Sequence, residues 1–226
     1  MMHFPICPRT QLIADTRIAY YWIALILLSL TLGGCSLQPT QPKLSPHRSS
    51  AQPEADWPEK WKAIQKIHAW MIMGKIGIRT KEQADSAVIN KWQQIEDEYL
   101  IELSSAVLGL GKTVLKGNGQ ELYLTNSDGE TLYSQEPQIL LQSQTGWELP
   151  LSNIPFWIKA IPAPGKPYQI QFDPQGNPQE IKQDGWTISA SRFQPFHQLN
   201  LPGKIVLSQK GNRITFVIHT WELDEA

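Results

Sequence analysis

Hydrophobic residues alternate with polar or small residues along several segments of the chain. In residues 70–78 every second position is Trp, Ile or Gly, and the same period of two recurs in residues 88–92 and 99–103. Alternate side chains of a strand point to opposite faces of a sheet, so this period predicts strands with one buried face. Residues 57–67 instead carry Trp and Ile three and four positions apart, which predicts a short amphipathic helix before the first strand.

Turn signals that contain glycine follow at short spacing. They are Asn118-Gly119, Asp128-Gly129, Gln175-Gly176-Asn177, Asp184-Gly185 and Lys210-Gly211-Asn212. Asn-Gly and Asp-Gly pairs suit the two-residue turns of antiparallel hairpins, because both residues tolerate a positive φ. The pattern predicts a meandering antiparallel sheet of about 10–11 strands.

Two apolar segments interrupt this series of strands. Residues 138–144 and 154–159 are predicted to be short helices, and the second is followed by Pro-Ala-Pro-Gly at residues 162–165. A large antiparallel sheet with helices in the middle of its sequence is typical of an incomplete barrel with a cover. We therefore predict a mainly β (α+β) fold, a half-open antiparallel β-barrel with a short α-helical lid over an apolar cavity.

A long apolar stretch, residues 18–32, lies near the N-terminus. It contains no charged residue and follows Arg9 and Arg17, which is the arrangement of an export signal. A membrane span needs about 20 apolar residues, so this shorter run favours a cleaved signal over a membrane helix. We expect residues 1–34 to be a signal peptide.

The apolar stretch ends in Leu32-Gly33-Gly34-Cys35, which resembles the lipobox of bacterial lipoproteins. The resemblance implies cleavage before Cys35 and a lipid attached to it; the alternative is an ordinary thiol beside a cleaved signal. Ser36 stands where an aspartate tends to retain such proteins in the inner membrane, so the resemblance implies a lipid-anchored protein of the outer membrane that faces the periplasm. The other cysteine, Cys7, lies in the signal, so we expect no disulfide in the mature chain.

Residues 35–56 are rich in Pro, Ser and Gln, and we expect a lipidated cysteine followed by a flexible tether. A tether of roughly 20 residues would span roughly 25 Å. We expect residues 57–226 to form one domain. Loss of residues 1–34 removes two of the 20 basic and one of the 21 acidic side chains, which leaves a formal charge of −2. This charge does not favour a nucleic-acid partner.

The sequence carries little catalytic or metal-binding chemistry. His47, His68, His197 and His219 do not stand at ligand spacing with a cysteine or a carboxylate. There is no Gly-x-Ser-x-Gly motif, no phosphate-binding glycine loop and no catalytic cysteine. We expect no catalytic residues, no metal and no cofactor apart from the lipid on Cys35. Catalytic groups can converge in space without a motif, so an envelope hydrolase stays open as an alternative.

Several short segments occur in a fixed order between residues 57 and 221. They are Gly74–Arg79, Trp92–Gln94, Val107–Gly109, Thr145–Trp147, Leu149-Pro150, Trp157, Pro162–Gly165, Gln183–Trp186 and Leu201-Pro202. In this order they resemble the LolB family, whose members accept lipoproteins from the periplasmic carrier LolA and place them in the outer membrane. The resemblance implies the same function without catalysis, with LolA, lipoprotein cargo and the bilayer as partners, and we expect a monomer.

The resemblance also assigns a membrane-insertion loop. The family's apolar Pro-Leu-Gly tip maps onto Val107, Leu108 and Gly109, and the resemblance gives Leu108 the role of delivery into the bilayer, with Leu110 as a second candidate. Apolar side chains are unusual in a loop between strands, and burial of one leucine in an apolar phase is worth about 1.5 to 3 kcal/mol. The alternative is that these leucines close one end of the core.

A lipoprotein cargo needs an apolar route. An acyl chain of about 15 methylenes costs on the order of 12 kcal/mol in water, so the cargo must pass directly from one apolar cavity to another. We expect inward side chains of the sheet and the lid to line this cavity: Ile76, Ile78, Val88, Trp92, Tyr99, Ile101, Leu103, Leu140, Leu141, Phe156 and Trp157. For each residue the alternative is ordinary core packing, and the alternative function is a structural or assembly lipoprotein that binds protein partners through the same sheet.

Overall fold

The alternating segments form strands in the computed structural model, which describes residues 57–105 and 111–223. Eleven strands are present: β1 (Ala69–Arg79), β2 (Ala84–Ile95), β3 (Glu98–Ser105), β4 (Gly111–Gly117), β5 (Leu122–Thr125), β6 (Thr131–Ser134), β7 (Tyr168–Phe172), β8 (Pro178–Gln183), β9 (Trp186–Phe196), β10 (Leu199–Gln209) and β11 (Asn212–Leu223). They form one antiparallel sheet in the order β6-β5-β4-β3-β2-β1-β11-β10-β9-β8-β7. The predicted antiparallel sheet of 10–11 strands is confirmed.

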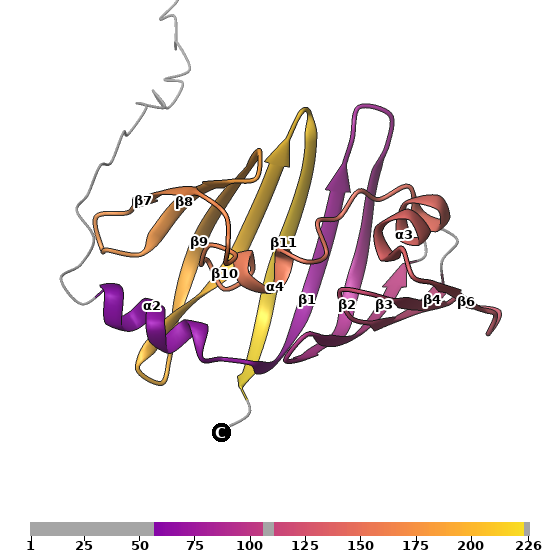
Figure 1. The fold of residues 1–226 in the computed structure, drawn as a ribbon, viewed down its shortest axis with the longest axis horizontal. Helices are drawn as coiled ribbons and strands as arrows, with labels where there is room; N and C mark the ends of the chain where they lie inside the picture. The colour runs from indigo at the N-terminus through magenta and orange to yellow at the C-terminus, as the bar shows by residue number, and fades with distance from the viewer. Residues whose placement is uncertain (1–56, 106–110, 224–226) are drawn as a thin grey trace, which may run out of the picture. The chain divides into compact units, whose positions relative to one another are not determined.

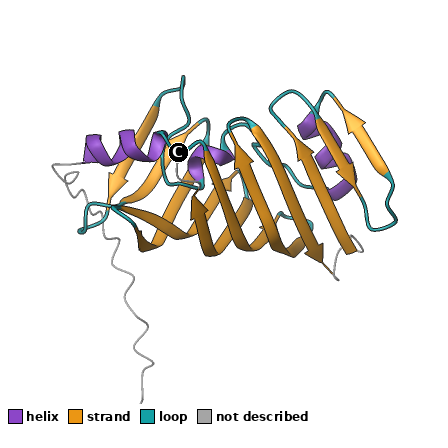
Figure 2. Cartoon of the chain, turned by 90° about the horizontal axis from the view of Figure 1, so that it is seen from below, coloured by secondary structure: helices purple, strands orange, loops and turns teal. Residues whose placement is uncertain are grey.

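The sheet is open, because β6 and β7 form its two edges and are not neighbours. It curves around the helices that lie on its inner face (Figure 1 and Figure 2). The chain passes from the β6 edge to the β7 edge through residues 135–167, which carry α3 (Pro137–Thr145) and α4 (Ile154–Trp157). This segment is the predicted helical lid, and its sequence position between the two edges takes it across the open side of the sheet.

Helix α2 (Trp57–Gln65) precedes β1, as the spacing of its apolar residues predicted. Trp57 and Ile64 are buried in a small cluster with Ile161 and Phe172. The rings of Trp57 and Phe172 pack edge to face, with their centres 5.1 Å apart. The helix therefore packs on the β7 side of the sheet. No helix in the described part of the chain is long and apolar enough to cross a membrane.

Two of the predicted glycine turns form tight hairpins. In the β8–β9 turn Asp184 and Gly185 have φ values of 55° and 77°, and in the β10–β11 turn Lys210 and Gly211 have values of 48° and 94°. Two successive positive φ values give the turn geometry that matches the twist of adjacent strands. The Asn118 turn is longer than predicted, because its Oδ1 accepts hydrogen bonds from the backbone N–H groups of Gln120 and Glu121.

A β-bulge in β2 corrects one sequence prediction. The β2–β3 register runs from Ile89 opposite Leu103 to Lys91 opposite Glu102, so Asn90 is an extra residue. The bulge reverses the alternation of inward and outward side chains along β2. Val88, which was expected on the inner face, is 43% exposed on the outer face, whereas Ile89 is 2% exposed. The prediction that Val88 lines the cavity is therefore wrong.

Gly74 marks a second irregularity, where the β1–β11 register shifts between Met73 and Gly74. A Cβ at residue 74 would come within 2.1 Å of the backbone oxygen of Val217. Only glycine allows β1 and β11 to approach this closely at the centre of the sheet.

Candidate functional site: the apolar interior under the lid

The lid buries large apolar side chains against the inner face of the sheet. Leu141, Trp147, Ile154, Trp157 and Ile158 are each at most 2% exposed, and all belong to the main core cluster. The inner face opposite them is formed by β1–β5 and β8–β11, and along strands such as β1 and β5 the buried residues alternate with outward-facing ones. The space between the sheet and the lid is thus apolar on both sides.

A small cavity remains between the sheet and the lid. Its volume is about 20 Å³, and its lining has no polar surface. The sheet contributes Ile76, Ile89, Trp92, Ile101, Leu103, Leu115 and Phe216, and the lid contributes Trp147, Leu149, Leu151 and Ile154. A single water needs about 10–15 Å³ of such volume together with polar partners, so this cavity is a dry void and is too small for an acyl chain.

A buried amide fixes the α4 half of the lid to the sheet. Gln183, at the end of β8, accepts hydrogen bonds on Oε1 from Trp157 Nε1 at 2.8 Å and from the backbone N–H of Ala163 at 2.8 Å. Its Nε2 donates to the backbone oxygens of Ala163 at 2.7 Å and Lys166 at 3.3 Å. The Gln183 side chain is buried, and its bonds to Trp157 and Ala163 satisfy lid groups that are buried as well.

Lys159 ties the same half of the lid to the segment before β1. Its Nζ donates a hydrogen bond to the backbone oxygen of Ile67 at 2.8 Å and lies 5.8 Å from the centre of the Phe156 ring. The side chain is buried, and no carboxylate of the described residues forms an ion pair with it. Burial lowers the pKa of Lys159 to about 8, because the charged ammonium is removed from water.

Polar contacts at the rim add to this attachment. Asp184 Oδ2 accepts hydrogen bonds from Lys166 Nζ at 2.6 Å and from Asn153 Nδ2 at 3.1 Å. The hydrogen bond from Lys166 holds the pKa of the Asp184 carboxyl below its usual range. Lys166 and Asp184 are exposed, so water and salt weaken the contribution of their ion pair to stability, whereas Asn153 is buried.

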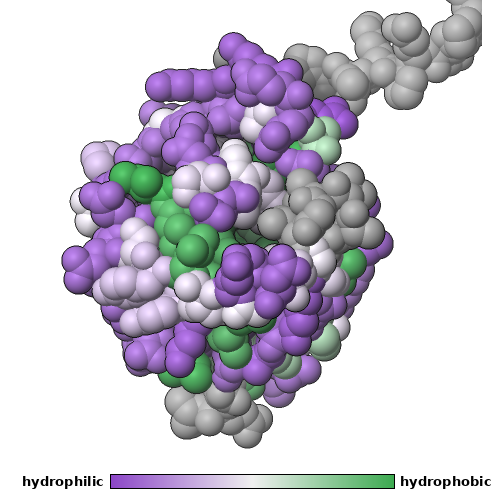
Figure 3. Space-filling model, turned by 90° about the vertical axis from the view of Figure 1, so that its right-hand side faces the viewer, coloured by the Kyte–Doolittle hydropathy of each residue, from purple (hydrophilic) through white to green (hydrophobic). Residues whose placement is uncertain are grey.

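The α3 half of the lid is attached more weakly. Leu141 is the one fully buried residue of α3, and Ile139 on the same helix is 60% exposed. The rim contact on this half joins Glu148 Oε2 to Asn212 Nδ2 at 3.3 Å. Figure 3 views the molecule from the end that carries β6 and α3, where apolar surface lies between hydrophilic residues. The α3 half therefore makes fewer polar contacts with the sheet than the α4 half, although Leu141 and Trp147 are buried there.

The structure groups most of the predicted cavity residues on the inner side of the sheet. Ile76, Trp92, Ile101 and Leu103 line the cavity directly. Four more are buried in the same core beside it, namely Ile78, Tyr99, Leu141 and Trp157, and two lid residues, Leu140 and Phe156, are partly buried against it. Val88 is the exception already described. Cys35, Val107, Leu108 and Leu110 lie outside the described residues, so their roles stay predictions.

Sequence reasoning missed several lining residues. The bulge places Ile89, rather than Val88, on the inner face. Leu115 and Phe216 lie in β4 and β11, which the sequence predicted from glycine turns and not from an alternation of residues. Trp147 and Leu149 lie between the two lid helices, outside both apolar segments that predicted helices. Their signal was present, because two large apolar residues in a connection with Gly146 and Pro150 are unusual for an exposed loop.

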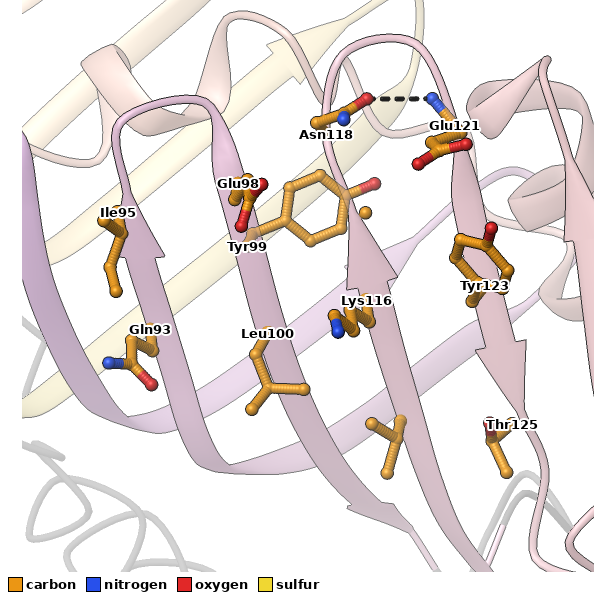
Figure 4. A pocket seen from close by; sticks show the side chains of 12 residues that line it. Gln93, Ile95, Glu98, Tyr99, Leu100, Lys116, Asn118, Glu121, Tyr123 and Thr125 are labelled. Atoms are coloured by element: carbon orange, nitrogen blue, oxygen red, sulfur yellow. Dashed lines mark hydrogen bonds between the residues drawn. The ribbon is translucent and has the colours of Figure 1, made fainter.

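A larger groove lies on the opposite face of the sheet. Its volume is about 610 Å³, and it crosses the outer side of β2–β5 (Figure 4). Leu100, Val114 and Tyr123 contribute apolar walls, but Lys116 and Glu98 line the same groove. An acyl chain placed there would lie beside charged groups and open solvent. The enclosed apolar space under the lid is chemically the better site for hydrocarbon, although it is much smaller when closed.

The chain is similar to proteins of a known family. Residues 68–221 match the family model described as outer membrane lipoprotein LolB. The chain belongs to the LolB family. It is therefore an outer-membrane lipoprotein, as the sequence predicted.

Individual relatives cover nearly the whole LolB-family chain. The outer-membrane lipoprotein LolB of Chromohalobacter salexigens is 36% identical over 93% of this chain and 92% of its own length. That of Marinobacter nauticus is 33% identical over 90% of this chain and 98% of its own. Among solved structures, a LolA superfamily protein from Nitrosomonas europaea is similar over 78% of this chain and 96% of its own, with 10% identity and a TM-score of 0.43.

Proposed function

We propose that this LolB-family protein accepts lipoproteins from the periplasmic carrier LolA and places them in the outer membrane. The observation that carries the proposal is the apolar interior between the inner face of the sheet and the lid, with a cavity that has no polar lining. Transfer then requires no reaction and no nucleotide, because the cargo moves toward the phase in which its acyl chains are best buried.

Lid displacement supplies the room that the closed cavity lacks. In the closed state the inner face is covered by lid side chains such as Trp147 and Leu149. An acyl chain that replaces them keeps the same inner face out of water, and its own burial is worth about 0.8 kcal/mol per methylene. The cargo therefore offsets the free energy of opening, and the empty protein closes again after delivery.

Transfer between purified proteins tests the acceptor role. The exported protein with Cys35→Ala, which carries no lipid, is mixed with LolA that holds a radiolabelled lipoprotein, and the cargo on each protein is measured after separation. We expect the label to move to the LolB-family protein. Label that stays on LolA at all protein ratios would remove the acceptor role and favour the assembly lipoprotein.

Delivery into the bilayer is tested separately through the loop. We propose that Leu108 touches the membrane, on the family resemblance, with Leu110 as the neighbouring candidate. Leu108→Glu should accept cargo from LolA as the unaltered protein does but release about tenfold less into liposomes, since a charge opposes entry into hydrocarbon. Leu110→Glu is the matched variant that assigns the role to one leucine. If both variants release cargo as the unaltered protein does, the loop has no part in delivery, and the alternative stands that its leucines close one end of the core.

A further inference from the structure

Four basic residues gather at two neighbouring turns on one end of the sheet. They are Arg79, Lys81, Lys210 and Arg213, all exposed, at the β1–β2 and β10–β11 turns, and together they form what we term the basic rim (Figure 1). Lys81 lies against the β10–β11 turn, since a Cβ added to Gly211 would lie 3.2 Å from Lys81 Cε. The two turns therefore present their positive charges side by side.

Two arginines of the basic rim repel each other across the sheet. Arg79 and Arg213 are directly opposite in the β1–β11 register. Side chains in such positions have their Cβ atoms about 5 Å apart, and like charges there are destabilising. The same row continues with Ala84 in β2 and Ser208 in β10, which carry no charge. The row itself thus supplies no counter-charge, and an anion bound from outside the chain would relieve the repulsion.

Carboxylates near the basic rim leave most of its charge uncompensated. Among the described residues, none forms an ion pair with any of its four members. Asp85 is opposite the core residue Ile78 and has a buried Oδ2, so its side chain is turned to the inner face. Asp184 is already paired with Lys166. Glu82 is the one exposed carboxylate of the two turns, which keep an excess of three positive charges.

The β2–β3 turn, at the other end of the strands, carries the opposite charge. Glu96, Asp97 and Glu98 are all exposed there. An anionic surface attracts the basic rim and repels this turn, so it would orient the protein along the strand direction. β3 runs in the same direction as β1, so β3 ends at Ser105 and β4 begins at Gly111 on the end that carries the basic rim.

We propose that the basic rim binds the phosphate groups of anionic lipids, so that this end of the sheet faces the surface of the outer membrane. Guanidinium groups make charge-assisted, bidentate hydrogen bonds to phosphate oxygens, and clustered Lys and Arg side chains gain affinity at an anionic bilayer. An outer-membrane lipoprotein keeps such a surface within reach. The inference goes beyond cargo transfer and does not depend on it, because the lipid is bound without cargo.

Vesicle binding tests the proposal with the soluble Cys35→Ala protein. One set of vesicles is pure phosphatidylcholine, and the other contains about one quarter phosphatidylglycerol, which should bind the protein about tenfold more tightly. A rise in NaCl from about 0.05 M to about 0.5 M should remove most of this preference, because salt screens exposed charges.

Two double variants separate the basic rim from net charge. Arg79→Gln with Arg213→Gln should weaken binding to the phosphatidylglycerol vesicles about tenfold. Its fold should hold, because the substitutions remove a like-charge pair. The control is Lys75→Gln with Lys204→Gln, which removes the same charge from the outer face, where both lysines are opposite Val217. Lys75 is about 13 Å along β1 from Arg79, so the control should bind within about twofold of the unsubstituted protein.

A second readout keeps the basic rim intact. Cys7 and Cys35 are the only cysteines of the sequence, so the soluble protein can carry a fluorophore at a single new cysteine. The two positions are Ala84→Cys, opposite Arg79, and Asp97→Cys on the β2–β3 turn. On phosphatidylglycerol vesicles, the label at residue 84 should brighten as it enters the headgroup region, and the label at residue 97 should not.

Equal affinity for the two kinds of vesicle overturns the proposal and leaves an acidic protein surface as the partner of the basic rim. Equal losses in the two double variants, or brightening at residue 97 alone, overturn it as well. Vesicle binding as expected together with failed transfer from LolA would remove the proposed function and leave this inference standing.

Discussion

Gln183 shows at the residue scale how the lid is held. One buried amide satisfies the Trp157 indole, both backbone groups of Ala163 and the backbone oxygen of Lys166. Gln183→Leu should lower the free energy of unfolding by about 3 kcal/mol, because it leaves several buried lid groups without partners. Urea denaturation followed by tryptophan fluorescence measures the loss.

Gln171→Leu is the matched control for Gln183, since Gln171 is exposed on the edge strand β7. It should change the free energy of unfolding by less than about 0.5 kcal/mol. Equal losses in the two variants would show that the amide network does not hold the lid.

Lys159 makes stability depend on pH. Its folded-state pKa is lowered to about 8, so between pH 8 and pH 10 the unfolded chain binds more protons than the folded protein, and stability rises with pH. The gain over this window should be about 2 kcal/mol. Tyr99 changes stability little below pH 10. Burial raises its pKa in the folded protein to about 12, and in the unfolded chain it loses its proton only near pH 10 and above.

Lys159→Met should abolish this rise and should be more stable than the unsubstituted protein at pH 7, since it removes an unpaired buried charge. Lys75→Met, at an exposed position of β1, should keep the rise. Urea denaturation at several pH values compares the three proteins. A flat profile in the unsubstituted protein would mean that Lys159 keeps an ordinary pKa.

The β2 bulge is the feature that matters most at the scale of the elements. Ile89 and Val88 are neighbours of similar chemistry, yet the bulge places the first in the cavity lining and the second outside. Ile89→Ala should cost about 3 kcal/mol of stability, whereas Val88→Ala should cost less than about 0.5 kcal/mol. Thermal or urea unfolding of the two variants measures both losses. A larger loss for Val88→Ala than for Ile89→Ala would mean that inward and outward residues alternate along β2 without a bulge.

The elements also show what sequence alone could predict. The period of two predicted β1–β3, the glycine turns predicted the further strands of the meander, and the apolar runs near residues 138 and 154 predicted both lid helices. The bulge has only a weak sequence signal, a polar Asn90 between the apolar Val88 and Trp92 with Ile89 beside it, and its position depends on the register with β3. The lid anchor was not visible, because Gln183 meets groups 17 to 26 residues away and nothing local distinguishes it from other strand glutamines.

At the scale of the whole molecule, the open sheet and the lid enclose an apolar interior that holds a cavity of only about 20 Å³. The lid joins the two edges of the sheet in sequence, and Gln183 and Lys159 make hydrogen bonds between its α4 half and the rest of the fold. The sequence and its family resemblance predicted the covered apolar interior. The small size of the closed cavity could not be predicted, because it depends on how the side chains of the sheet and the lid interlock.

The position of the bound acyl chain tests the central claim most directly. A lipoprotein with a photoreactive diazirine in one acyl chain is loaded onto the soluble Cys35→Ala protein, irradiated, and its adducts are mapped by mass spectrometry. We predict adducts on inner residues such as Ile101, Leu115 and Leu149. Adducts confined to the outer groove at Leu100, Val114 and Tyr123 would contradict an interior that opens to receive the chain.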